Sequence, residues 1–226
     1  MLTTWADYLS MAARFHLDIS NEIVFRAKNL RRRHDELVKR SNQGKDLSVQ
    51  IGEIMLTHPR VESILQSLIP KYSYAGKEYL VAVPAGVEDI IQEGRYLEHC
   101  IASSQRYWDR IEQGEGYLLF LRKADAPDTP YYTMEVEPNG TVRQLRTFYD
   151  NQHSDIDAAR DFLREWQTVI AERLTEEDRQ AAAVSRVLRE QEFEEMRQNN
   201  VVIYTGNLAG KRLVDVLTAD LMEAAA

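Results

Sequence analysis

The feature that most constrains the fold is an Asn139-Gly140 pair between two strand-like segments. Residues 131–137 (YYTMEVE) and 141–148 (TVRQLRTF) are rich in aromatic and β-branched side chains, which are typical of β-strands. Asn-Gly is the preferred pair for a two-residue type I′ turn. The sequence therefore predicts an antiparallel hairpin with a loop of these two residues.

The register of this hairpin predicts one polar and one apolar face. With a two-residue loop, Glu135 lies opposite Gln144, and Thr133 lies opposite Arg146. Because side chains alternate along a strand, these four share one face. The other face carries Met134, Val136 and Leu145. We expect helices on the apolar face, whereas the polar face is either a solvated surface or a functional site.

Residues 117–122 (YLLFLR) are apolar at nearly every position, which is typical of a strand buried on both faces. The polar face of the hairpin is then expected to be partly covered. Arg122 either reaches that polar face or is a solvated strand end. Residues 78–83 (EYLVAV) form a further expected strand, so the sheet should have about four strands.

The order of these patterns predicts an α+β fold. Residues 1–70 are expected to form a helical N-terminal lead-in. Residues 71–174 are expected to form the core, a small and mainly antiparallel sheet packed on helices. Residues 175–226 are expected to form a helical extension.

The extension begins with a charged helix that has a thin apolar seam. Residues 172–197 hold eight Asp/Glu and five Arg, and the seam consists of Val184, Val187 and Leu188. This pattern fits a projecting arm that binds a partner, such as a homodimer helix over 175–200, or a partly frayed surface helix.

A basic cluster lies in the N-terminal region. Residues 26–45 carry eight Lys/Arg and two Asp/Glu, a formal charge of +6. It either contacts phosphates or an acidic partner, or forms a solvated helix face. The candidate contact residues are Arg31, Arg32, Arg33, Lys39 and Arg40.

Composition limits the other possibilities. The 226 residues carry a formal net charge of -8, which argues against nucleic-acid binding through the whole surface. One cysteine excludes an internal disulfide and fits a reducing compartment. No apolar run approaches the ~18 residues of a membrane span, and the N-terminus lacks a secretory pattern. We expect a cytoplasmic protein with no membrane association.

Residues 87–92 are expected to form a short helix closed by Glu93-Gly94, with YLEHCI following in helical geometry at 96–101. Neighbours on a helix point about 100° apart, so His99 and Cys100 cannot easily form a nucleophile-base pair. Cys100 is either a buried structural residue or a reactive thiol, and we favour the structural role. The five histidines are scattered, so no metal site is expected. No cofactor is expected either.

Several segments follow one another in a specific order: WADYLSMAARFHLDIS, NLRRRHDEL, YLVAVP, EGRYLEHCI, Tyr107, LFLRKADAPDTPYYTMEVEPNG, VRQLR and Asn151. In this order they resemble the PcfJ-like proteins of conjugative plasmids and related mobile elements. The resemblance covers roughly residues 2–165.

The resemblance implies that His99, Cys100, Thr133, Glu135 and Gln144 belong together. The chain departs from the family pattern at a few of its positions. Glu98 stands where the family tends to have a first histidine, Thr147 stands where it has a glycine, and Asn151 comes one residue late, with Asp150 in its place. If these positions form a site, the departures imply that this chain has altered or lost part of its activity.

Three functions remain open. The first, which we favour, is an accessory binding module of a plasmid or phage-like element that recruits a protein or nucleic acid. The second is an enzyme acting on a nucleotide or nucleic acid, with Glu135 as general base or ribose ligand and His99 as acid or positioning donor. The third is an inhibitory or structural protein that occupies a host partner. The candidate catalytic residues are therefore His99, Glu135 and Gln144. The candidate binding residues are Thr133, Arg146, Arg122, Tyr107 and Asn151.

Overall fold

The computed structural model describes residues 2–44, 47–99, 101, 104–203 and 208–224, with the side chains of 2–4 and 39–44 excepted. Helices surround one antiparallel sheet, so the predicted α+β class is confirmed. None of the helices in these ranges is long and apolar enough to cross a membrane. Cys100 lies outside the described residues.

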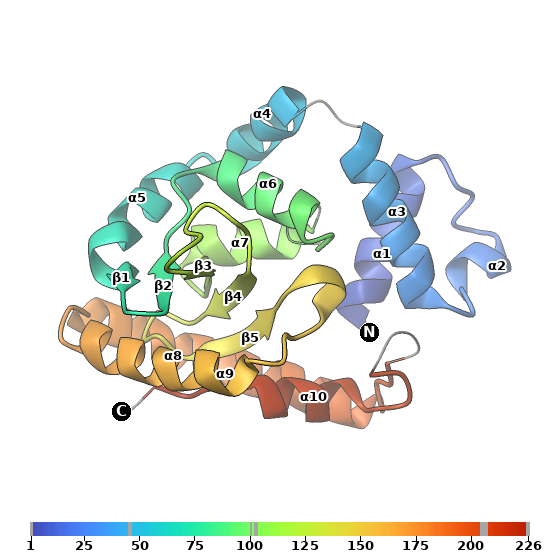
Figure 1. Ribbon diagram of the computed structural model, residues 1–226. Helices are drawn as coiled ribbons and strands as arrows, with labels where there is room; N and C mark the ends of the chain where they lie inside the picture. The colour runs from blue at the N-terminus through green and yellow to red at the C-terminus, as the bar shows by residue number, and fades with distance from the viewer. Residues whose placement is uncertain (1, 45–46, 100, 102–103, 204–207, 225–226) are drawn as a thin grey trace.

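The N-terminal helices form a group with its own small core (Figure 1). These are α1 (Leu2–Arg14), α2 (Glu22–Phe25) and α3 (Leu30–Gly44). Their apolar sides meet around Tyr8, Met11, Ala12, Leu30, Leu37 and Val38. Burial of these side chains away from the main core makes α1–α3 a distinct packing unit, which we call the N-terminal unit.

The sheet has five strands in the order β1-β2-β3-β4-β5, and each neighbouring pair is antiparallel. The strands are β1 (Tyr74–Ala75), β2 (Tyr79–Ala82), β3 (Tyr117–Lys123), β4 (Tyr132–Val136) and β5 (Val142–Arg146). The two-residue strand β1 was missed by the expectation of about four strands. Such a short segment carries no readable alternation.

The predicted hairpin register is confirmed, but the predicted loop is wrong. Glu135 pairs with Gln144, and Thr133 pairs with Arg146, as expected. The loop has three residues rather than two, because the Glu137 amide donates to the Thr141 oxygen at 2.8 Å. A β-bulge beside Glu135 then shifts the register by one residue, which restores the expected pairs.

Helices cover both faces of the sheet. On the apolar face, α8 (Ile156–Ala171) places Phe162 5.6 Å from the Tyr79 ring, and α5 (Val61–Tyr72) places Tyr72 5.8 Å from Tyr117. In Figure 1, α6 (Val87–Tyr96) and α7 (Gln105–Gln113) lie on the opposite side of the sheet from α8. Helix α8 therefore covers the apolar face of the sheet, where the hairpin pattern predicted helices. One more helix, α4 (Leu47–Thr57), precedes the sheet in the chain.

The polar face is buried, so its interpretation as a solvated surface is wrong. Thr133 and Glu135 are 5% and 4% exposed. Their cover includes α9 (Glu176–Gln198), which packs back onto the core and does not project from it. Lys71 Nζ binds both carboxylate oxygens of Asp178 at 2.7 Å, which fixes the start of α9. The last helix, α10 (Leu213–Asp220), follows and packs beside β5.

Helix α6 is longer than expected. Glu93 and Gly94 lie inside it and are buried, so they do not close the helix. The chain leaves helical geometry at Glu98, which has a φ of 54°. The helical geometry assumed for His99 is therefore wrong, and His99 lies in a turn after the helix.

Candidate functional site

Glu135 lies in a buried ionic cluster on the polar face. Arg110, from α7, forms an ion pair with it, and Gln144 Nε2 donates to Glu135 Oε2 at 3.3 Å. Burial alone would raise the pKa of Glu135, but the positive charges of Arg110, Arg106 and Arg143 lower it to about 2. A carboxylate held this way is ionised at neutral pH and is a weak base.

The β-bulge brings Arg143 into this cluster. Arg143 lies 3.5 Å from the Glu135 carboxylate, and its Nε donates to Glu137 at 2.8 Å. Arg189, from α9, donates to the same Glu137 oxygen at 2.7 Å. Regular alternation would have put Arg143 and Gln144 on opposite faces. In the bulge, both side chains reach Glu135.

Thr133 and Arg122 belong to a second buried ion pair. Arg122 binds the Glu93 carboxylate with two nitrogens at 2.9 and 2.6 Å, and Thr133 Oγ1 donates to it at 3.3 Å. Burial raises the pKa of Glu93, and its bonds with Arg122 and Thr133 oppose this effect. Arg122 is thus not a solvated strand end. It joins α6 to the sheet.

His99 is bonded elsewhere, in the turn after α6. Its Nε2 donates to the backbone oxygen of Thr147, and the ring is 3% exposed. Burial lowers the pKa of His99 to about 4, helped by Arg31 and Arg146 and opposed by the bond to Thr147. The ring is therefore neutral at pH 7. In the described part of the chain, no contact joins His99 to Glu135.

Arg146 leaves the hairpin cluster and binds the C-terminal helix. It forms an ion pair with Asp220 of α10, which also accepts from Gln152 Nε2 at 3.0 Å. On the other side of His99, Arg31 of the N-terminal unit forms an ion pair with Asp150. The charged groups around His99 therefore connect the N-terminal unit, the sheet and α10.

The positions at which the sequence is expected to depart from the resembled pattern gather around this turn. Glu98 and Tyr149 share a hydrogen bond, and the carboxylate of Asp150 lies 4.0 Å from His99 Nε2. Glu98, Tyr149 and Asp150 all have φ values between 54° and 57°, which are uncommon for residues other than glycine. Together with Thr147, they make a locally strained site that we call the His99 turn.

The other candidate binding residues have structural contacts. Tyr107 is half-buried and packs against the main core. The backbone oxygen of Asn151 accepts from the Thr147 amide at 2.9 Å, which closes the loop after β5. Within the described ranges, no group of three or more His, Cys, Asp or Glu side chains is placed to hold a metal ion.

The arginines of the basic helix α3 differ in their contacts. Arg31 is about one-third exposed and reaches Asp150. Arg32 and Arg33 point to solvent and share one carboxylate, that of Glu36, at 2.9 and 3.8 Å. The side chains of Lys39 and Arg40 lie outside the described residues.

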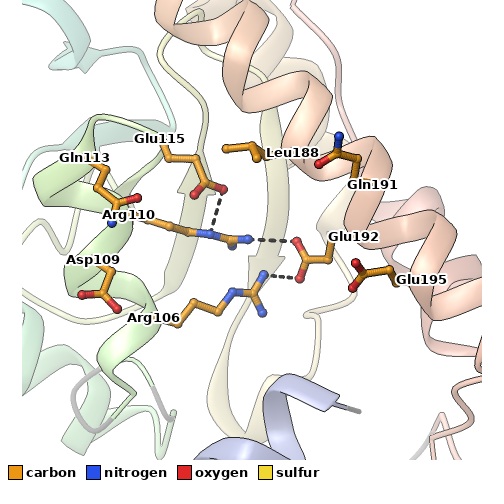
Figure 2. Close-up of a pocket in the computed structure, with 9 residues that line it drawn as sticks. All are labelled: Arg106, Asp109, Arg110, Gln113, Glu115, Leu188, Gln191, Glu192 and Glu195. Atoms are coloured by element: carbon orange, nitrogen blue, oxygen red, sulfur yellow. Dashed lines mark hydrogen bonds and ion pairs between the residues drawn. The ribbon is translucent and has the colours of Figure 1, made fainter.

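A pocket of about 440 Å³ opens between α7 and α9. Figure 2 shows Arg110 and Arg106 crossing it to the carboxylate of Glu192, at 2.9 and 2.6 Å. Arg110 also binds Glu115 at 3.0 Å. The full lining is Arg106, Asp109, Arg110, Gln113, Glu115, Leu188, Gln191, Glu192 and Glu195. Neither His99 nor Glu135 lines it.

Sequence reasoning missed the partners of the polar face, chiefly Glu93, Arg110 and Arg189. One signal was present. The apolar strand at 117–122 indicated burial on both faces, and a buried carboxylate such as Glu135 then requires a buried cation. Which helix would supply that cation depends on packing between distant segments, which the sequence pattern does not give.

Comparison with known proteins finds a matching family and a relative of this chain. The family model described as PcfJ-like protein matches residues 4–159. One relative is the uncharacterized protein Lin1253/Lin1744 of Listeria innocua, which is 28% identical over 142 residues. The match covers 63% of this chain and 29% of that protein, so the chain spans less than a third of its relative. No solved structure matches.

Proposed function

We propose that this chain, which belongs to the PcfJ-like protein family, is an accessory binding module of a plasmid or phage-like mobile element and contacts nucleic acid through α3. The observation that carries the proposal is the exposure of Arg32 and Arg33, whose side chains are 69% and 58% exposed. His99 and Glu135, in contrast, are buried in hydrogen-bonded clusters. The chain would act in the cytoplasm, where such an element is copied and packaged.

Electrostatics supports this role for α3. Two exposed guanidinium groups share the single carboxylate of Glu36. Exposed ion pairs are worth little, about 0–1 kcal/mol, so a phosphate can replace Glu36 at small cost. Arginine also suits phosphate because its planar group can donate two parallel hydrogen bonds. Lys39 and Arg40 follow on the same helix and add to its formal charge.

The buried charges fit a scaffold better than a reaction. Nearby arginines lower the pKa of Glu135 to about 2. His99 is neutral and bonded to a backbone oxygen. Neither group is placed to exchange a proton with a substrate at neutral pH. These contacts support the binding module over the enzyme.

The test separates Arg32 and Arg33 from Arg31, since Arg31 also holds the N-terminal unit to Asp150. A double variant, Arg32→Ala with Arg33→Ala, is titrated against a labelled DNA duplex by fluorescence anisotropy over a range of salt. We expect weaker binding and a salt dependence reduced by about two phosphate contacts.

The matched control is Arg164→Ala with Arg179→Ala. These arginines are also exposed and paired with acidic neighbours on their own helices, at 3.0 and 3.8 Å. The control should bind as the unchanged protein does. Equal loss in both double variants would indicate a general charge effect, and no loss in either would contradict the contact through α3.

A further inference from the structure

Helix α9 carries an exposed stripe with an apolar centre and acidic ends. Val184, Val187 and Leu188 are 61%, 51% and 41% exposed, and their spacing puts them on one side of the helix. Glu177 lies seven residues before Val184, and Glu195 lies seven residues after Leu188. Seven residues are close to two helical turns, so all five share that side. We call these five residues the α9 stripe.

The acidic ends of the α9 stripe are not neutralised by α9 itself. Its exposed arginines pair with other glutamates of the same helix. These pairs are Arg179 with Glu176, Arg186 with Glu190, and Arg197 with Glu194. Over the described ranges, no ion pair involves Glu177 or Glu195, and both are exposed. Glu177 accepts hydrogen bonds from its own amide and from Thr175, which are local contacts at the start of α9. The stripe therefore presents two carboxylates that no ion pair of the described residues neutralises, beside an apolar surface.

The stripe continues into the pocket between α7 and α9. Leu188 and Glu195 belong to both, and Figure 2 shows them with Gln191 on the α9 wall. Asp109 and Gln113 lie on the α7 wall. A cavity of about 440 Å³ has room for a long side chain. Arg106 and Arg110 already pair with Glu192 and Glu115 there, but the lining holds four carboxylates and two guanidinium groups, so it still favours a cationic side chain.

We infer that the α9 stripe docks a basic amphipathic helix of a protein partner. Apolar side chains of the partner pack on Val184, Val187 and Leu188, and Lys or Arg side chains bind Glu177 and Glu195. The two carboxylates are eighteen residues apart, or about 27 Å at 1.5 Å per residue. The partner helix therefore needs basic residues about five turns apart with an apolar side between them.

Charge also distinguishes this partner from a second copy of the chain. Two antiparallel α9 helices would bring Glu177 of one copy against Glu195 of the other. Two parallel helices would bring each carboxylate against its own counterpart. Both arrangements place like charges together, which opposes a homodimer through the residues 175–200.

The experiment uses the full chain and two synthetic helical peptides labelled with a fluorophore. Both peptides have a leucine stripe at their centre, and their ends carry either lysines or glutamates. Anisotropy titrations are run with the unchanged chain, with Leu188→Asp, and with the double variant Glu177→Lys, Glu195→Lys. Arg186→Gln is the matched control, because Arg186 is also exposed but lies off the stripe.

We expect the chain to bind the lysine peptide and to reject the glutamate peptide. Leu188→Asp should weaken binding by about tenfold or more, since a central apolar contact is lost. The double charge reversal should exchange the preference, and Arg186→Gln should change nothing. All substituted positions are exposed, so folding should survive, and unchanged circular dichroism checks this.

Two results would overturn the inference. One is equal affinity for both peptides in every variant. The other is self-association of the unchanged chain that Leu188→Asp abolishes, which would make a second copy the occupant. Because the α9 variants leave α3 intact, DNA binding should persist in all of them, and its loss would bear on the proposed function separately.

Discussion

His99 donates its Nε2 hydrogen to the backbone oxygen of Thr147, a residue 48 positions later in the chain. This bond joins the turn after α6 to the loop after β5. A second bond, from the Tyr149 amide to the Leu97 oxygen at 3.1 Å, lies beside it. The two bonds hold Glu98 and Tyr149 in left-handed backbone conformations, which cost free energy in residues other than glycine. The His99 turn is therefore held by the surrounding structure.

Burial of His99 predicts a pH dependence of stability. The pKa falls from 6.5 to about 4 on folding, chiefly through burial. Between these values the unfolded chain binds more protons, so the free energy of unfolding should fall as the pH drops from about 6.5 to 4. The loss should approach roughly 3 kcal/mol. Urea unfolding at pH 7 and pH 4.5 measures it.

His99→Gln is the variant to compare, because its amide can still donate to Thr147 but does not titrate in this range. Part of the loss between pH 7 and 4.5 should disappear in this variant. An identical pH dependence in both proteins would show that His99 is not the group responsible.

Removing the charge of Glu135 should destabilise the sheet. Glu135→Gln leaves Arg110 and Arg143 buried with one fewer negative charge, and breaking a buried ion pair costs about 3–5 kcal/mol. The lowered pKa of Glu135 also predicts a pH dependence. Ionised Glu135 stabilises the folded protein above pH 4.5, and this stabilisation is lost as the pH falls toward 2.

Equilibrium unfolding in urea at pH 7 compares Glu135→Gln with Glu190→Gln, an exposed carboxylate on α9. The second change should stay within about 0.5 kcal/mol. A similarly small effect at Glu135 would mean that the cluster contributes little to stability.

The hairpin shows how far the sequence pattern reaches. Its pairing of Glu135 with Gln144 was predicted from a two-residue turn, although the real loop has three residues. The bulge beside Glu135 compensates for the added loop residue, so two local departures cancel. Alternation predicts which face each residue of a regular strand takes. Arg143 lies on the other face because of the bulge, and the bulge has no clear sequence signal.

The His99 turn was harder to predict for a different reason. Family resemblance grouped His99 with Glu135, but their side chains have separate partners. His99 depends on Thr147 and Arg31, which are far away in the sequence and meet only after the N-terminal unit packs on the core. Local periodicity describes single elements, and it does not specify which elements pack together.

The ion pair of Arg31 with Asp150 should help attach the N-terminal unit. Asp150→Asn keeps a side chain that tolerates a positive φ but removes the charge. We expect a loss of about 1 kcal/mol, since both side chains are more than a third exposed. Limited proteolysis should also cut the N-terminal unit faster.

A double-mutant cycle with Arg31→Ala tests whether the two residues act together. If they do, the double variant should lose less stability than the sum of the single changes. Strict additivity, with unchanged proteolysis in all three variants, would argue that other contacts attach the N-terminal unit.

Two glycines should respond to alanine with opposite signs. Gly140, in the hairpin loop, has a φ of 88°, and an added Cβ would lie 2.6 Å from Ile170 Cδ1. Gly140→Ala should therefore destabilise the protein by about 1–3 kcal/mol, from backbone strain and displacement of Ile170. Gly52 lies within α4, and its added Cβ would meet nothing within 4 Å. Gly52→Ala should stabilise by about 0.5–1 kcal/mol. Equilibrium unfolding in urea measures both changes. A neutral Gly140→Ala would mean that the three-residue loop tolerates a different backbone, and that the bulge beside Glu135 can adjust with it.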